Sequence, residues 1–173
     1  LGSGEPPVIF TLGSIVAHFE PDFYREAFDA AIRLQRRAIL LTGSGAIRIG
    51  RSNPKILEVD YARLHEILPR SAAVVHAGGI GTCGEALRAG IPSVIIPFSF
   101  DQPDNAQRMK RLGVAEILSR RSIKATAIAI KLERVLRDPS YTLLARNCAN
   151  QINAAPTMDL VLDKMESLRA SVE

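Results

Sequence analysis

Short apolar runs alternate with longer amphipathic stretches along most of the chain. Six of these runs have the length of buried strands, and they cover residues 8–12, 38–41, 56–59, 72–75, 93–96 and 114–117. The stretches between them repeat apolar residues at helical spacing, as Tyr24, Phe28 and Ala31 do. Continuous apolar strands separated by helices are typical of a parallel sheet that is covered on both sides. The sequence therefore predicts an α/β fold, a Rossmann-like parallel sheet with helices on both faces.

Proline and glycine mark where several of the helices should begin and end. Pro21 lies near one helix start, Pro69 should end a short helix, and a helix that opens at Thr82 should stop at Gly90. Residues 101–112 form another predicted helix. From residue 123 the pattern is helical to the end, with breaks near residues 138–139 and 155–156 and no further strand.

The composition suits one folded domain. The chain has 173 residues, of which 47% are hydrophobic, enough for a single core. Residues 1–7 read as a linker or boundary segment, and residues 8–173 as the domain. The net charge of +4 is modest and the basic residues lack aromatic interleaving, so we expect no nucleic-acid partner. Cys83 and Cys148 match neither a redox motif nor a zinc-ligand spacing.

The apolar runs and the N-terminal residues indicate where in the cell the protein is expected. No run approaches the roughly 18 apolar residues of a membrane span, and the N-terminus lacks a signal-peptide pattern. We expect a reduced, cytoplasmic setting. One basic cluster is interpreted as a solvated face, with a peripheral membrane surface as the alternative; it comprises Arg108, Lys110, Arg111, Arg120, Arg121 and Lys124.

Three turns follow predicted strands at the edge where α/β sheets bind ligands. They contain Gly13 and Ser14, residues 78–82, and residues 98–102. Glycine lets the backbone approach a diphosphate closely, and the hydroxyls of Ser14 and Thr82 can donate to its oxygens. These turns predict a phosphate-binding crevice, although a glycine cluster alone also fits a tight strand-to-helix turn. The spacing fails the dinucleotide fingerprint, and no P-loop lysine is present.

Three polar side chains could complete this crevice. Glu85 lies one helical turn beyond Thr82 and could reach ribose hydroxyls, or could be an ordinary surface glutamate. Asp101 and Gln102 combine an acceptor with an amide that both donates and accepts, which suits adjacent sugar hydroxyls. Capping of the following helix is the alternative role for Asp101.

An ordered set of motifs resembles the C-terminal domain of GT-B glycosyltransferases, closest to the sterol and antibiotic-aglycone glucosyltransferase group. The set comprises Thr11-Leu12-Gly13-Ser14, Leu68-Pro69-Arg70, His76-Ala77-Gly78-Gly79-Ile80-Gly81-Thr82, Glu85, Ala89-Gly90-Ile91-Pro92, Pro97 and Asp101-Gln102-Pro103-Asp104-Asn105-Ala106. It spans roughly residues 6 to 120. The resemblance implies the C-terminal half of a GT-B fold and a nucleotide-sugar donor site.

The resemblance also assigns roles to individual residues. It implies that the diphosphate is held by Gly13, Ser14, His76, Gly78, Gly79, Gly81 and Thr82. Glu85 would bind the ribose, and Asp101 with Gln102 would bind the donor sugar. The uracil would lie near residues 59–61 and Leu68, where the family often has a tryptophan that this chain lacks.

His76 occupies the histidine position of the family motif. Many members carry a second histidine where this chain has Ala77. An imidazole that donates a hydrogen bond at the end of a strand could stabilise charge on a departing diphosphate. The alternative is a histidine satisfied beside the core.

The family's acceptor pocket and catalytic base lie in an N-terminal domain, which this sequence does not contain. His18 could face the cleft between the domains, but its position also suits a solvated loop. In the family a final helix crosses onto the N-terminal domain; residues 158–168 could be that helix or could pack on their own domain. The implied partner is an acceptor-binding domain in the same or another chain.

The implied reaction is transfer of a hexose from UDP-hexose, expected to be UDP-glucose, to a hydroxyl of a lipophilic acceptor with inversion. No motif requires a metal or a further cofactor. A second hypothesis is an inactive UDP-sugar-binding module, or a subunit of a two-polypeptide transferase. A UDP-sugar epimerase would need carboxylates across the cleft that the sequence does not provide.

Overall fold

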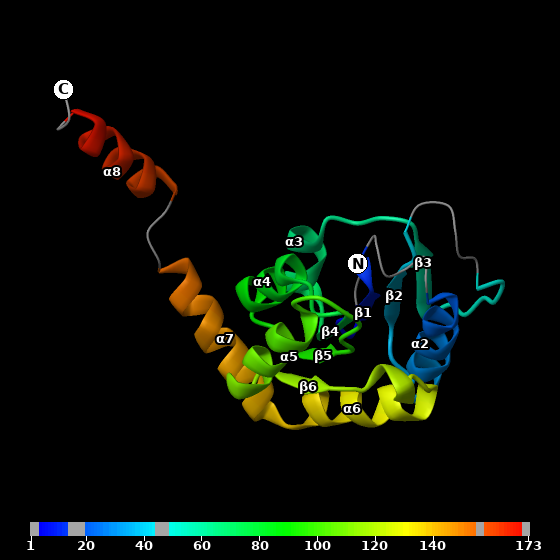
Figure 1. Cartoon of the computed structure of the whole chain (residues 1–173). Coiled ribbons are helices and arrows are strands. Elements are labelled where there is room, and N and C mark those ends of the chain that lie inside the picture. The colour runs from blue at the N-terminus through cyan, green and yellow to red at the C-terminus, as the bar shows by residue number, and fades with distance from the viewer. Residues whose placement is uncertain (1–3, 14–19, 44–48, 155–157, 171–173) are drawn as a thin grey trace.

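Six parallel strands form one sheet in the computed structural model, which describes residues 4–13, 20–43, 49–154 and 158–170 (Figure 1). The strand order is β3-β2-β1-β4-β5-β6, and all five pairings are parallel. The strands are β1 (Val8–Thr11), β2 (Ala38–Leu41), β3 (Ile56–Val59), β4 (Ala73–His76), β5 (Ser93–Ile95) and β6 (Ala115–Ile117). The predicted α/β fold is confirmed, and each predicted strand end lies within one residue of the observed end.

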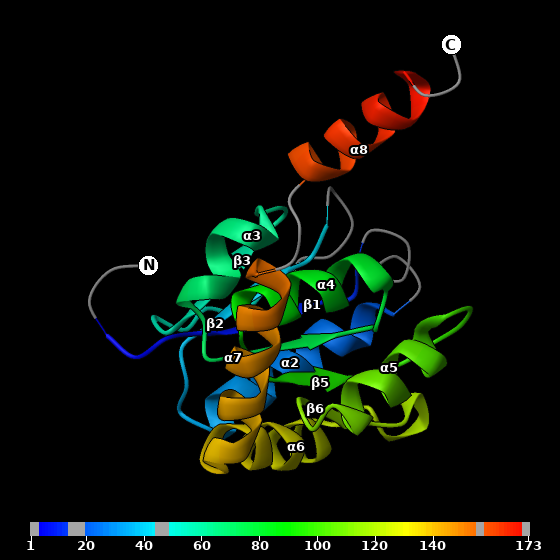
Figure 2. The same cartoon turned by 90° about the vertical axis from the view of Figure 1, so that its left-hand side faces the viewer.

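Helices cover both faces of this sheet (Figures 1 and 2). They are α2 (Pro21–Arg33), α3 (Leu64–Ile67), α4 (Ile80–Ala89), α5 (Gln102–Arg111), α6 (Ala125–Arg137), α7 (Pro139–Asn153) and α8 (Met158–Ala170). Two single 3₁₀ turns, η2 (Leu68–Arg70) and η3 (Arg120–Ser122), lie among them. Helices α2 and α6 pack together on one face, and α3, α4, α5 and α7 lie on the other.

Alternate strand residues belong to different parts of the core, as the two-residue period of a strand requires. Val8 and Phe10 of β1 lie in the cluster under α2 and α6, whereas Ile9 between them lies in the cluster under η2 and α4. A third cluster, which includes Ile95 and Met109, lies under α5 and α7. Burial on both faces explains why the strands read as unbroken apolar runs.

One helix boundary differs from the sequence prediction and two agree with it. Helix α3 ends at Ile67, before Pro69, as predicted, and the chain continues in the 3₁₀ turn η2, where proline is tolerated in the first turn. Helix α4 begins at Ile80, with Gly79 as its N-cap, two residues earlier than predicted. Its predicted stop is confirmed: Gly90 has a φ of 68°, a left-handed conformation that favours glycine.

The last helix, α8, projects from the rest of the structure (Figures 1 and 2). The described side chains of this helix are exposed, so it does not pack on its own domain as one alternative proposed. A shallow hollow of about 610 Å³ runs along it, lined by Leu160, Val161, Asp163, Lys164, Met165 and Ser167. Among the helices that the structure describes, none is long and apolar enough to cross a membrane.

The chain reverses direction across the sheet between β1 and β4. It runs outward from β1 to β2 and β3, and then returns to place β4 on the other side of β1. Ligands of open α/β sheets bind beyond the carboxyl ends of the strands at such a switch point. The topology therefore favours a ligand site at the turns after β1 and β4.

Candidate functional site

The carboxyl ends of β1, β4 and β5 lie level with one another. The strand register pairs Thr11 with His76 and His76 with Ile95. The turns that follow these strands therefore meet at one edge of the sheet, as predicted. Of the predicted site residues, Ser14 lies outside the described residues, as does His18 of the same turn.

Gly78, directly after β4, occupies a position that only glycine fits. Its φ is 92°, and a Cβ there would lie 2.8 Å from Cγ2 of Ile95 and 3.2 Å from the backbone oxygen of Gln102. Both the backbone conformation and the close approach of the next loop therefore require glycine. The structure gives a physical reason for this residue that is independent of any ligand.

The next residues present free backbone amides at the start of α4. The first helical hydrogen bond runs from the amide of Cys83 to the oxygen of Gly79, so the amides of Ile80, Gly81 and Thr82 precede it and have no acceptor within the helix. A Cβ at Gly79 or Gly81 would meet no atom within 4 Å. Open space thus lies over a helix N-terminus, the arrangement that favours an anion.

A cleft of about 450 Å³ connects the turns after β1 and β4. It is lined by Thr11, Gly13, Leu41, Gly43, Asp60, Tyr61, Ala62, Leu64 and Thr82. The cleft brings Gly13 and Thr82 together, as the sequence predicted. Tyr61 is 79% exposed and offers an aromatic face in the segment predicted to hold the base, whereas Leu68 is fully buried and cannot line that site.

His76 ends β4 beneath the glycine turn. Its Nδ1 accepts a hydrogen bond from the amide of Gly78 at 3.1 Å, so the proton of the neutral ring is carried by Nε2. Nε2 is buried, and it has no partner among the described residues. Burial lowers the pKa of His76 to about 4. At neutral pH the residue is therefore an uncharged hydrogen-bond donor whose only N–H is unused.

Asp101 and the Gly78 turn are joined by a residue that the sequence analysis did not single out. Nδ2 of Asn105 donates to the oxygen of Gly78 at 3.0 Å and to Oδ2 of Asp101 at 2.8 Å. Asp101 occupies the N-cap position of α5, yet its side chain makes no capping hydrogen bond. The capping alternative is therefore wrong. The four-residue spacing of Asp101 and Asn105 on one helix was the available signal.

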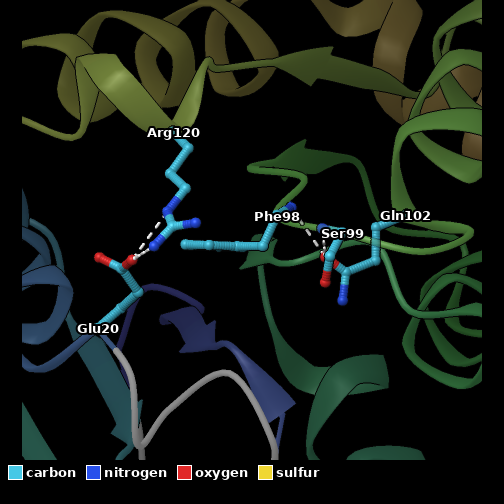
Figure 3. A network of polar contacts seen from close by, with 5 residues as sticks. All are labelled: Glu20, Phe98, Ser99, Gln102 and Arg120. Carbon is cyan, nitrogen blue, oxygen red and sulfur yellow. Dashed lines mark hydrogen bonds and ion pairs between the residues drawn. The ribbon is translucent and has the colours of Figure 1, made fainter.

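Gln102 has fewer free hydrogen-bonding groups for a ligand than its side-chain type predicts. Its Oε1 accepts hydrogen bonds from the amides of Phe98 at 2.8 Å and Ser99 at 3.2 Å (Figure 3). An amide oxygen has two lone pairs, so these bonds occupy it. The predicted role as donor and acceptor for sugar hydroxyls is thus reduced to donation from Nε2.

Glu85 lies on α4, but it does not line the 450 Å³ cleft. Its Oε1 lies 3.3 Å from Nη1 of Arg88, an exposed pair one helical turn apart. Glu85 lies one helical turn from Thr82 on α4 but outside the lining of the cleft, so its role toward a ribose stays a prediction.

Three of the six residues of the predicted basic cluster take part in separate ion pairs. Arg108 pairs with Asp104, and Lys124 pairs with Glu26. Arg120 bonds to Glu20, and its guanidinium lies over the ring of Phe98, 5.2 Å from the ring centre (Figure 3). These contacts support a paired, solvated surface. No group of three or more metal-ligating side chains occurs in the part of the chain that the structure describes.

Residues 26–168 match the family described as erythromycin biosynthesis protein CIII-like, C-terminal domain. The chain belongs to this family. Membership confirms the predicted C-terminal domain of a GT-B glycosyltransferase.

A curated relative and two solved structures illustrate the match. O-mycaminosyltylonolide 6-deoxyallosyltransferase of Streptomyces fradiae is 35% identical over 155 residues, which is 89% of this chain and 36% of that protein. The calicheamicin glycosyltransferase CalG4 superposes with a TM-score of 0.89 at 22% identity, covering 97% of this chain and 44% of that one. The spinosyn rhamnosyltransferase SpnG, solved with thymidine diphosphate, gives 0.79 at 24%, covering 95% and 46%.

These similarities concern the fold and only part of each relative's length. The two structures share the fold with this chain. The chain spans about a third of the length of the Streptomyces fradiae relative. None of the three proteins is named as a sterol glucosyltransferase, so the sterol part of the resemblance stays a prediction.

Proposed function

We propose that this chain is the donor-binding half of an inverting glycosyltransferase that moves a hexose from UDP-hexose, expected to be UDP-glucose, to a hydroxyl of a lipophilic acceptor. Membership of the erythromycin CIII-like family supports the reaction class. The observation that carries the proposal is the turn after β4, where free amides at the start of α4 border open space beside the 450 Å³ cleft.

The diphosphate is assigned to this turn because the local field favours an anion. The amides of Gly81 and Thr82 and the Thr82 hydroxyl supply donors, and the helix N-terminus adds partial positive charge. The ring of His76 contacts the same turn through Nδ1, and we assign its unpartnered Nε2–H as a further donor to the diphosphate. Donors aimed at a departing diphosphate lower the barrier because charge develops there in the transition state.

Two residues are assigned to the donor sugar. The Asp101 carboxylate accepts hydrogen bonds from sugar hydroxyls through the lone pairs that Asn105 leaves unused, and Gln102 donates from Nε2. Glu85 is assigned to the ribose. In the reaction the acceptor oxygen attacks C1, the bond from C1 to the diphosphate breaks, and the acceptor proton passes to a base. That base is expected in an N-terminal acceptor-binding domain.

A thymidine nucleotide is the second candidate for the donor. The spinosyn rhamnosyltransferase was solved with thymidine diphosphate, and its fold matches this chain. Uracil and thymine differ by one methyl group, and stacking on the exposed ring of Tyr61 would accept either base. A direct comparison of UDP with thymidine diphosphate therefore distinguishes the two donors.

An inactive nucleotide-sugar-binding module, or a subunit of a two-polypeptide transferase, is the alternative to a complete enzyme. The coding sequence upstream of residue 1 distinguishes them. An encoded domain with a histidine paired to a carboxylate supports the transferase, and the lack of such a domain supports the module or the two-polypeptide form.

Calorimetric titration of this chain tests donor binding. UDP, UDP-glucose and thymidine diphosphate are compared with ADP and NAD, using the wild type and His76→Ala. We expect a pyrimidine diphosphate to bind and ADP and NAD to bind at least tenfold more weakly. Weaker pyrimidine diphosphate binding by His76→Ala supports the assignment of His76. Equal binding of all five ligands, or of none, would contradict the proposal.

A further inference from the structure

The loop after β5 is held in an unusual conformation at the edge of the proposed sugar site. Phe100 has a φ of 57°, in the left-handed region that a bulky residue seldom occupies, and its side chain is 89% exposed. Such a conformation costs free energy and persists only when surrounding contacts fix it. The loop that contains Phe100 is therefore held by contacts with its surroundings.

Two sets of contacts act on Phe98 from opposite sides, one on its backbone and one on its ring (Figure 3). On one side, Oε1 of Gln102 accepts hydrogen bonds from the amides of Phe98 and Ser99. On the other side, the guanidinium of Arg120 lies over the Phe98 ring, 5.2 Å from its centre. A cation over an aromatic face is attracted by the ring and limits its movement.

Arg120 is itself held in place across the sheet. Its Nε donates to Oε1 of Glu20 at 2.8 Å, and its Nη2 donates to the same oxygen. Glu20 is the N-cap residue of α2 and is only 20% exposed. The pair joins segments 100 residues apart in the sequence. Because η3 follows β6 and α2 follows β1, Arg120 spans the edge of the sheet that carries the site.

We propose that Arg120 is a positioning residue for donor-sugar recognition. The stacked guanidinium, held by Glu20, fixes Phe98 and with it the loop that leads to Asp101 and Gln102. Arg120 is not expected to touch the donor. This inference rests on the proposed function, because it concerns the residues assigned there to the sugar.

The test separates sugar recognition from nucleotide binding. The dissociation constants of UDP and UDP-glucose, and of thymidine diphosphate and its glucose ester, are measured for the wild type, Arg120→Ala, Arg120→Lys and Glu20→Gln. Arg121→Ala is the matched control, since Arg121 is exposed on the same turn. A general structural defect would weaken both members of a pair, whereas loss of positioning raises the Kd ratio of sugar nucleotide to nucleotide.

We expect Arg120→Ala to raise this ratio roughly three- to tenfold, the combined effect of one partly exposed ion pair and one cation–π contact. Arg120→Lys and Glu20→Gln should give smaller increases, because lysine lacks the planar fork and glutamine lacks the charge. Arg121→Ala should leave the ratio within twofold of the wild type.

The outcomes distinguish the two proposals. If the wild type binds neither nucleoside diphosphate, the proposed function fails, and this inference fails with it. If the wild type binds but the ratio in Arg120→Ala stays within twofold, or if both dissociation constants rise by the same factor, the positioning role is overturned and the proposed function stands. Should Arg120→Ala not fold, Arg120→Lys and Glu20→Gln decide by the same ratio.

Discussion

Nδ2 of Asn105 donates a hydrogen bond to Oδ2 of Asp101 at 2.8 Å. The same nitrogen donates to the backbone oxygen of Gly78 at 3.0 Å. One buried amide therefore sets the position of a predicted sugar-binding carboxylate relative to the predicted phosphate turn. The two subsites are coupled through a residue that need not contact a ligand.

Replacing Asn105 by alanine should affect both stability and sugar recognition. Two hydrogen bonds are lost and a buried carbonyl loses its donor, so the free energy of unfolding should fall by about 1–3 kcal/mol. Affinity for UDP-glucose should fall more than affinity for UDP, because Asp101 is no longer oriented. Denaturant unfolding and calorimetry measure these effects, with Gln107→Ala, exposed on the same helix, as the control. Equal losses in the two variants would contradict this assignment.

Gly78 and Gly81 should respond in opposite ways to alanine. Gly78→Ala introduces a Cβ 2.8 Å from Ile95 in a left-handed conformation, which should destabilise the fold by about 2 kcal/mol or more. Gly81→Ala meets no atom and lies in a helix, so it should stabilise the fold by about 0.5–1 kcal/mol. The new methyl group at position 81 should nevertheless weaken UDP binding. A stabilised Gly81→Ala protein with unchanged UDP affinity would place the diphosphate elsewhere.

Burial of His76 should make the protein sensitive to mild acid. Its pKa is about 4 in the folded state and 6.5 as the ordinary value, so the unfolded chain binds the proton more tightly. The stability that this difference provides is complete above pH 6.5 and is lost as the pH falls toward 4. It amounts to about 3 kcal/mol.

Unfolding of the wild type and His76→Gln at pH 7.5 and pH 4.5 isolates this contribution. The pKa of Glu116 is also lowered, by hydrogen bonds from Lys131 and Tyr141 and by nearby positive charge that outweigh the effect of its burial, so acid weakens both proteins. The wild type should lose more stability than His76→Gln over this range. Identical losses would show that His76 does not titrate as a buried histidine.

Glu116 on β6 forms a polar cluster with Tyr141 and Lys131. A substitution in this cluster should change stability without changing ligand binding. Oε1 of Glu116 accepts a hydrogen bond from the hydroxyl of Tyr141 at 2.6 Å. Oε2 of Glu116 accepts a hydrogen bond from Nζ of Lys131, also at 2.6 Å. Tyr141→Phe removes a hydrogen bond to a buried charge and should cost about 1.5–3 kcal/mol. UDP affinity at a temperature where the variant is folded should match the wild type, because the cluster touches none of the site turns. A loss of affinity would reveal coupling between β6 and the site.

The arrangement of the sheet could be predicted from the sequence because burial on both faces leaves a strong local signal. Residues 38–41 and 56–59 are strands at the predicted positions. Gly78 could be recognised from the sequence as part of a tight turn, and its φ of 92° and its close neighbours explain why glycine is needed there. The start of α4 was predicted two residues late, at Thr82, because Gly81 was assigned to the glycine turn although it lies inside the helix.

The side-chain network of the site could not be predicted in the same way. Arg120 and Glu20 are 100 residues apart, and nothing local indicates that they meet. The occupation of the Gln102 oxygen depends on how the preceding loop folds back. Such contacts follow from tertiary geometry, and the sequence indicates only the types of group available.

The most direct test of the central claim is to locate the diphosphate by amide chemical shifts. A ¹H–¹⁵N titration of the chain with UDP, repeated with thymidine diphosphate, reports each backbone N–H separately. We expect the largest shifts at Gly79, Gly81 and Thr82, with smaller ones near Tyr61. Shifts concentrated elsewhere, for example along α8, or no saturable shifts with either nucleotide, would contradict the assignment of this turn as the donor site.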